Sequence, residues 1–107
     1  TMKRVSGIEG QRTPLQSRIL QAVENLAAGE VVSFGDIAAR AGRPDAARAA
    51  GAVLAGAADY PWWRVVYSDG HLPPCNPGLQ AQRLTKEGVQ LRGFRVLQSP
   101  SGRFASQ

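Results

Sequence analysis

The stretch that decides the fold is SFGDIAARAGRPDAARAAG, which occupies residues 33–51. Ser33 followed three positions later by Asp36 is typical of a capping box, so we predict that a short helix begins here. After the break at Pro44, an alanine-rich helix is expected over residues 45–58, and its small side chains allow another backbone to approach closely. Two helices joined by a turn make a helix-turn-helix candidate.

The flanking residues predict a small α+β domain, similar to a winged helix, around this pair of helices. Thr13 as the N-cap and Pro14 at the first helical position open an amphipathic helix that Gly29 ends. Val31-Val32 is too short to be more than a β-bridge. Further along, the expected elements are a strand at residues 65–67, a helix at residues 79–87, and a short hairpin of residues 89–91 and 94–97.

The chain length favours one domain. Its 107 residues lie at the short end of the usual range of about 100 to 200 residues per domain, and we expect no separate cofactor-binding domain. We expect residues 1–12 to form a flexible N-terminal tail, because no periodic apolar pattern is present there. Residues 13–97 are then the folded domain, and residues 98–107 a flexible C-terminal tail.

Composition predicts a soluble, intracellular protein. Hydrophobic residues make up 43% and charged residues 20%, and no apolar run reaches the roughly 18 residues of a membrane span. The first dozen residues do not resemble a secretory leader, and the single cysteine, Cys75, fits a reducing compartment. We expect a cytoplasmic monomer, associated with the nucleoid if bacterial, that needs no cofactor and binds no membrane.

The charge balance points to a polyanionic partner. Lysine and arginine number 13 against 8 acidic residues, a net charge of +5. Only Lys3 and Lys86 are lysines, so eleven of the 13 cations are arginines, which bind phosphate bidentately and stack on bases. Nucleic acid is therefore the first partner to consider. The alternative is that the arginine, alanine and glycine content reflects a GC-rich genome.

Three segments together resemble the DNA-binding domain of the O6-alkylguanine-DNA alkyltransferases. They are VSFGDIA at residues 32–38, GRPDAARAAG at residues 42–51 and PWWRVV at residues 61–66. The second segment matches the family pattern Gly-x-Pro-x-Ala-Ala-Arg-Ala-Val-Gly with one change, at Ala50. In the enzymes the third segment has Pro-Cys-His-Arg-Val, whose cysteine accepts the alkyl group, and that position is Trp62 here. This replacement is typical of the alkyltransferase-like proteins.

The resemblance implies a DNA-binding surface on the alanine-rich helix. It implies that Arg48 enters the duplex and replaces a flipped nucleotide. It also implies that Phe34 acts as a wedge, without the hydroxyl of the family's tyrosine. The other predicted DNA-binding residues are Ser33, Ala47 and Gly51. The alternative for Arg48 is a surface arginine that Asp45 or a phosphate neutralises.

The resemblance also implies a pocket for the flipped base. Trp62 offers no thiolate, but stacking of a base on its indole is worth about 1 to 3 kcal/mol. Trp63 stands where the enzymes have a histidine that helps to deprotonate the cysteine. The predicted pocket residues are Tyr60, Trp62, Trp63, Arg64 and Asn76. Adjacent residues of an extended segment face opposite sides, so we expect one tryptophan in the pocket and one packed behind it. The alternative is that both are ordinary core aromatics.

Metal binding is not expected. His71 and Cys75 lie four residues apart, but two ligands do not complete a tetrahedral zinc site. The same pair could form a Cys–His nucleophile, yet their loop offers no obvious third group to orient the histidine. No catalytic residue is predicted.

Taken together, these features predict a DNA-damage sensor without enzymatic activity. It would bind double-stranded DNA, flip O6-alkylguanine into the pocket and mark the site for nucleotide excision repair, the last step resting on the resemblance alone. Two alternatives stay open. One is a residual methylated-DNA–protein-cysteine methyltransferase that uses Cys75, and the other is a helix-turn-helix DNA-binding protein without lesion preference.

Overall fold

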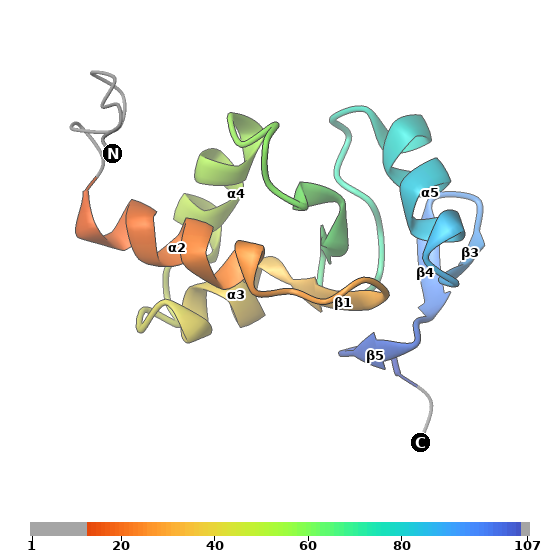
Figure 1. Cartoon of the computed structure of the whole chain (residues 1–107), viewed down its shortest axis with the longest axis horizontal. Coiled ribbons are helices and arrows are strands. Elements are labelled where there is room, and N and C mark those ends of the chain that lie inside the picture. Colours follow the sequence, from red (N-terminus) through yellow and green to blue (C-terminus); the bar gives the residue numbers. More distant parts are fainter. Residues whose placement is uncertain (1–12, 106–107) are drawn as a thin grey trace, which may run out of the picture.

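A computed structural model describes residues 13–105 and confirms the α+β class (Figure 1). Its helices are α2 (Pro14–Glu24), α3 (Phe34–Arg40), α4 (Ala47–Ala55) and α5 (Pro77–Lys86), with a short 3-10 helix η1 (Trp62–Arg64). Its strands are β1 (Glu30–Ser33), β2 (Val65–Val66), β3 (Gln90–Arg92), β4 (Arg95–Gln98) and β5 (Ser101–Gly102). Helices α2, α3 and α4 gather at one end, and α5 with the β3–β4 hairpin at the other. No helix within the described part is long and apolar enough to cross a membrane.

The first helix begins as predicted. The Thr13 hydroxyl accepts a hydrogen bond from the Gln16 backbone nitrogen at 3.1 Å, and the Gln16 side chain accepts one from the Thr13 nitrogen at 3.0 Å. This reciprocal pair satisfies two donors that a helix start otherwise leaves free. Helix α2 ends at Glu24, earlier than the expected stop at Gly29, because the chain turns there and buries Leu26 in the core.

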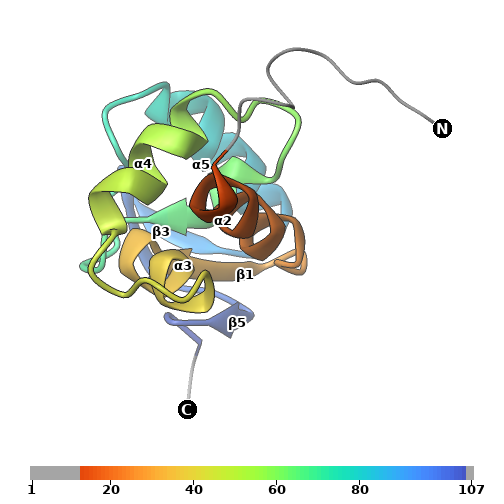
Figure 2. The same ribbon diagram turned by 90° about the vertical axis from the view of Figure 1, so that its left-hand side faces the viewer.

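The predicted pair of helices joined by a turn is present in α3 and α4 (Figure 2). The Ser33 hydroxyl accepts from the Asp36 backbone nitrogen, and the Asp36 carboxylate accepts from the Ser33 nitrogen, both at 3.0 Å. Helix α4 is shorter than the expected 45–58 because it ends at Gly56, its C-cap. The two helices pack closely, since Ala50 faces the core with no exposed surface.

Strand β1 corrects the prediction of a mere bridge at Val31-Val32. It is the central strand of a parallel sheet with the order β2-β1-β5, in which Val32 pairs with Val65 and Glu30 with Ser101. Both partners are remote in the sequence, so a four-residue pattern could not reveal them. The β3–β4 hairpin at the other end is antiparallel, as predicted.

The C-terminal segment also differs from expectation. A flexible tail was predicted from residue 98, but residues 98–105 fold back onto β1. The Arg103 backbone nitrogen donates to the Val31 carbonyl at 2.8 Å, and the Arg103 guanidinium pairs with Asp36 at 2.9 Å. Backbone pairing with β1 and one ion pair hold this segment. The predicted N-terminal tail, residues 1–12, lies outside the described residues.

The closeness of β5 to β1 makes Gly102 sensitive to substitution. Its φ is +89°, and an added Cβ would collide with the Val31 carbonyl oxygen and lie 2.8 Å from the Val31 nitrogen. We expect Gly102→Ala to lower the free energy of unfolding by about 1 to 3 kcal/mol, as measured by urea denaturation.

Gly56→Ala is the matched control, because Gly56 has a negative φ of −108° and no atom within 4 Å of an added Cβ. This control should unfold at nearly the wild-type urea concentration. Equal stability of the Gly102→Ala and Gly56→Ala proteins would contradict a folded C-terminal segment.

Candidate nucleic-acid interface

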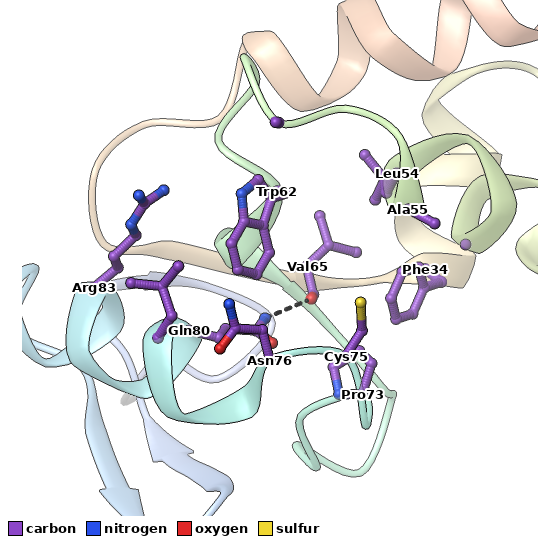
Figure 3. Close-up of a pocket in the computed structure, with 13 residues that line it drawn as sticks. Phe34, Leu54, Ala55, Trp62, Val65, Pro73, Cys75, Asn76, Gln80 and Arg83 are labelled. Carbon is purple, nitrogen blue, oxygen red and sulfur yellow. Dashed lines mark hydrogen bonds between the residues drawn. The ribbon is translucent and has the colours of Figure 1, made fainter.

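A pocket of about 370 Å³ lies among α4, η1 and α5 (Figure 3). This volume is within the range of about 300 to 1,000 Å³ that is usual for small-molecule sites. Its apolar walls comprise Phe34, Gly51, Leu54, Ala55, Ala58, Val65, Pro73 and Leu79, together with the indole of Trp62. The remaining lining residues are Cys75, Asn76, Gln80 and Arg83. The site is thus a largely apolar cavity with a few polar groups, as expected for a pocket that encloses a planar ring.

Trp62 forms one side of the pocket, and Leu54 and Ala55 of α4 lie across from it (Figure 3). The indole is half-buried and meets the Trp63 ring edge to face, with the ring centroids 6.0 Å apart. As expected, one tryptophan lines the pocket and the other packs behind it, against the core that contains Leu84. The segment is a 3-10 helix rather than extended, so the helical turn separates the two rings.

Glu87 anchors η1 from behind. Its carboxylate accepts hydrogen bonds from Trp63 Nε1 at 2.9 Å, from Arg64 Nε at 3.0 Å and Nη2 at 2.7 Å, and from the Gly29 nitrogen at 2.8 Å. Arg64 also donates to the Leu26 carbonyl at 2.8 Å. Burial alone would raise the pKa of Glu87, but these hydrogen bonds hold that pKa below its ordinary value. Trp63 therefore braces the pocket from behind, in agreement with the expectation for one of the two tryptophans. Arg64 was predicted to line the pocket, but it also lies behind the wall and is not among the lining residues.

Of four other predicted site residues, one lines the pocket and three lie outside it. Asn76 lines the pocket from the N-cap of α5, where its φ is +59°. Tyr60 was predicted in the pocket but packs instead against the core of α2, α3 and α4. Ser33 is only 2% exposed and its hydroxyl caps α3, so the prediction that this side chain contacts DNA is corrected. Ala47, the first residue of α4, is half-buried.

Arg48 projects from the first turn of α4 and is exposed. Asp45, the alternative partner considered above, pairs with Arg43 at 3.1 Å instead. Among residues 13–105, no carboxylate binds the Arg48 guanidinium. Gly51, three positions later, lies on the same face of the helix and lines the pocket. An unneutralised arginine therefore stands on the helix face that borders the pocket.

Cys75 and His71 do not form a catalytic pair. Cys75 lines the pocket and is exposed, whereas His71 lies outside it, with Nδ1 2.9 Å from Asp69. No histidine or carboxylate is among the residues that line the pocket, so none is placed there to deprotonate the thiol. In the part of the chain that the structure describes, no group of three metal-ligating side chains is present.

Sequence reasoning missed two residues of α5. Gln80 is 1% exposed, and its amide donates to the Trp63 carbonyl at 3.0 Å and to the Val65 carbonyl at 3.1 Å, the second of which is drawn in Figure 3. These bonds tie η1 and β2 to the helix. Arg83, three positions later, has its guanidinium carbon within cation–π distance of both tryptophan rings. The available signal was their spacing, because residues three apart in a predicted helix share one face.

Comparison with known proteins specifies the kind of domain that the helix pair and the adjoining pocket form. The sequence profile of the 6-O-methylguanine DNA methyltransferase family, DNA binding domain, matches residues 14–89. The chain belongs to this family. The curated "DNA base-flipping protein" of Escherichia coli (strain K12) is 41% identical over 81 residues, which are 71% of this chain and 63% of that protein. The chain thus spans less than two thirds of that relative.

Solved structures of two kinds are similar to this chain. Schizosaccharomyces pombe Atl1, solved with damaged DNA containing O6-carboxymethylguanine, has 28% identity and a TM-score of 0.67 over 73% of this chain and 79% of that chain. S. pombe ATL in complex with DNA has 26% identity and a TM-score of 0.71 over 86% and 94% of the two chains. Mycobacterium tuberculosis O6-methylguanine methyltransferase has 30% identity and a TM-score of 0.64, covering 72% of this chain and 50% of that one.

The support that Glu87 gives to η1 depends on pH. Glu87→Gln should cost roughly 3 kcal/mol of unfolding free energy at pH 7, because Arg64, with 14% of its side chain exposed, loses its counter-charge. The pKa of Glu87 is lower in the folded than in the unfolded chain, so the stabilisation is full above the unfolded value of about 4.3. It is lost as the pH falls through the folded value. Urea unfolding at pH 7, 5 and 3 should show the two proteins converging.

The exposed Glu24 provides a matched control, since Glu24→Gln makes the same chemical change on the solvent side of α2. This variant should follow the wild type at each pH. A stability difference for Glu87→Gln that stays constant down to pH 3 would show that the carboxylate charge does not support η1.

Proposed function

We propose that the protein recognises O6-alkylguanine in double-stranded DNA by flipping the damaged base into the pocket beside Trp62, without taking up the alkyl group. The observation that carries this proposal is an indole that lines the pocket at the position where the family's enzymes have their acceptor cysteine. The name of the E. coli relative, a base-flipping protein, supports the mode of binding. The Atl1 structure with O6-carboxymethylguanine supports the class of lesion.

The pocket suits binding better than chemistry. Extruding a base costs a few kcal/mol, and one base–aromatic contact of about 1 to 3 kcal/mol offsets much of that cost. The apolar walls from Leu54, Ala55 and Pro73 can enclose an alkyl group without a hydrogen-bond requirement. Alkyl transfer would need a thiolate held near a base, and Trp62 offers no ionisable nucleophile.

Arg48 is the residue that we propose to fill the gap left by the flipped base. It is exposed on α4, has no carboxylate partner within the described residues, and shares a helix face with the pocket residue Gly51. Phe34 and Ala47, at the starts of α3 and α4, are proposed to face the DNA beside it. The net charge of +5 would add a salt-dependent attraction to the phosphates.

The consequence of binding is proposed from resemblance alone. The protein–DNA complex would mark the lesion for nucleotide excision repair, whose proteins would be its partners. Such a role would place the protein at chromosomal DNA in the cytoplasm, associated with the nucleoid if the cell is bacterial.

A second candidate function has one observation in its favour. Cys75 lies in the same pocket as Trp62, so its thiol could in principle accept an alkyl group from a bound base. The pocket provides no histidine or carboxylate to generate the thiolate, which makes this residual methyltransferase the weaker candidate.

Trp62→Ala tests the proposed function directly. In a competition titration of duplexes that differ only in O6-methylguanine or guanine at one site, the wild type should prefer the lesion. Loss of the indole face should reduce that preference by about 1 to 3 kcal/mol while affinity for plain DNA stays nearly constant. Phe94→Ala, which removes a 53% exposed aromatic ring outside the pocket, should leave the preference unchanged.

The same titration separates the alternatives when the O6-methyl group is labelled. We expect the label to remain on the DNA. Label on the wild-type protein that is lost in Cys75→Ala would establish the methyltransferase instead. Equal wild-type affinity for the two duplexes would indicate a helix-turn-helix protein without lesion preference.

Arg48→Ala should impair flipping more than folding. We expect the affinity for a lesion duplex to fall about tenfold, or roughly 1.4 kcal/mol, because no side chain then fills the gap that the flipped base leaves among the stacked bases. The signal of a fluorescent base analogue opposite the lesion, which reports extrusion, should be lost. Arg92→Ala removes another exposed arginine, on β3, and is the charge control. Normal flipping by Arg48→Ala would exclude Arg48 from the mechanism.

A further inference from the structure

The pocket contains one cation and no anion. Among the 13 residues that line it, Arg83 alone is charged, and Asn76 and Gln80 contribute neutral amides. The Gln80 amide nitrogen already donates to two backbone carbonyls, so this group is committed to the fold. The electrostatic character of the pocket therefore depends on Arg83.

Arg83 is held at the pocket wall by the two tryptophans. Its guanidinium carbon lies 4.8 Å from the Trp63 ring centroid and 5.8 Å from that of Trp62, and Figure 3 shows the side chain extending from α5 beside Trp62. Contact with an aromatic face orients a guanidinium without using its N–H donors in the ring plane. Arg83 is thus positioned beside the tryptophans, is half-buried and lines the pocket, and among the described residues no side-chain hydrogen bond or ion pair engages it.

No carboxylate of the described residues neutralises Arg83. Arg64, the other cation near Trp63, pairs with Glu87 at 2.7 Å, and no ion pair joins Glu87 to Arg83. A half-buried cation beside an apolar cavity interacts more strongly with an anion than an arginine in bulk water does. The site therefore favours a ligand that brings its own negative charge.

We propose that Arg83 makes the pocket selective for O6-alkyl groups that end in a carboxylate over neutral groups of similar size. A guanidinium pairs with a carboxylate through two parallel hydrogen bonds, whereas a methyl or amide group gains little from the charge. This inference rests on the proposed function, since the adduct enters the pocket on a flipped guanine. It adds the substrate class: acidic adducts, of which carboxymethyl is the smallest example.

The test uses four duplexes that differ at one base: guanine, O6-methylguanine, O6-carboxymethylguanine and its neutral isostere O6-carbamoylmethylguanine. The full chain should bind the carboxymethyl duplex about tenfold more tightly than the carbamoylmethyl duplex, the scale of one charge-assisted hydrogen bond. Arg83→Gln should bring these two affinities together and leave the O6-methyl affinity nearly unchanged. Arg92→Gln, the same charge change at an exposed site on β3, should preserve the preference.

The possible outcomes of this titration separate failure of the proposed function from failure of the inference on Arg83. If the wild type binds none of the adducts better than guanine, the proposed function fails. If it prefers adducts but does not separate carboxymethyl from carbamoylmethyl, the inference on Arg83 fails while the proposed function stands. Equal weakening of all four duplexes by Arg83→Gln would show that Arg83 contacts a phosphate, which also overturns the inference.

Arg83→Lys keeps the test decisive if the glutamine variant does not fold. Lysine retains the charge without the planar fork, so it should weaken binding of the carboxymethyl duplex more than that of the carbamoylmethyl duplex. An equal effect on both duplexes would contradict selection by Arg83.

Discussion

The parallel pairing of β1 with β2 is the constraint on which the rest of the structure depends. Because alternate side chains of a strand face opposite ways, Val32 and Val65 enter the core of the three helices α2, α3 and α4, while Val31 and Val66 enter the core beneath α5. Two small hydrophobic clusters thus share one pair of strands. Helix η1 leads directly into β2, so the position of Trp62 is fixed relative to both cores and the pocket forms where the two halves meet.

The hydrogen bonds behind η1 explain how a pocket that lacks the acceptor cysteine can keep its shape. Trp63 occupies the position of the enzymes' histidine, and its indole N–H donates a hydrogen bond to the Glu87 carboxylate. An indole has a donor but no acceptor lone pair, so Trp63 makes a hydrogen bond to Glu87 and cannot take up a proton. Together with the contacts of Arg64 and Gln80, it holds Trp62 in place before any ligand arrives. These contacts preorganise the indole face that the proposed function assigns to the flipped base.

Local signals in the sequence predicted where α2 and α3 begin, whereas they did not reveal the strand pairing between distant segments. Thr13 and Ser33 each have a side chain that caps its own helix, and such reciprocal bonds lie within four residues of the chain. Strands β1 and β5 are held by backbone groups some seventy residues apart, so Ser101 and Gly102 carry no pattern that reveals a strand. The pocket was predicted only in part for the same reason: Trp62 belongs to a recognisable segment, but Arg83 reaches it from a different helix.

The arginines of this chain act in two ways that composition alone cannot separate. Arg40, Arg43, Arg64 and Arg103 each pair with a carboxylate, so they contribute anchoring and little excess charge. Arg48 and Arg83 have no such partner among residues 13–105, and they belong to α4 and α5, the two helices that flank the pocket. The positive charge that no carboxylate offsets therefore lies beside the pocket as well as over the rest of the surface. Under the proposed function, surface cations would attract DNA regardless of its sequence, whereas selection among bases would depend on the few groups, Trp62 above all, that line the pocket.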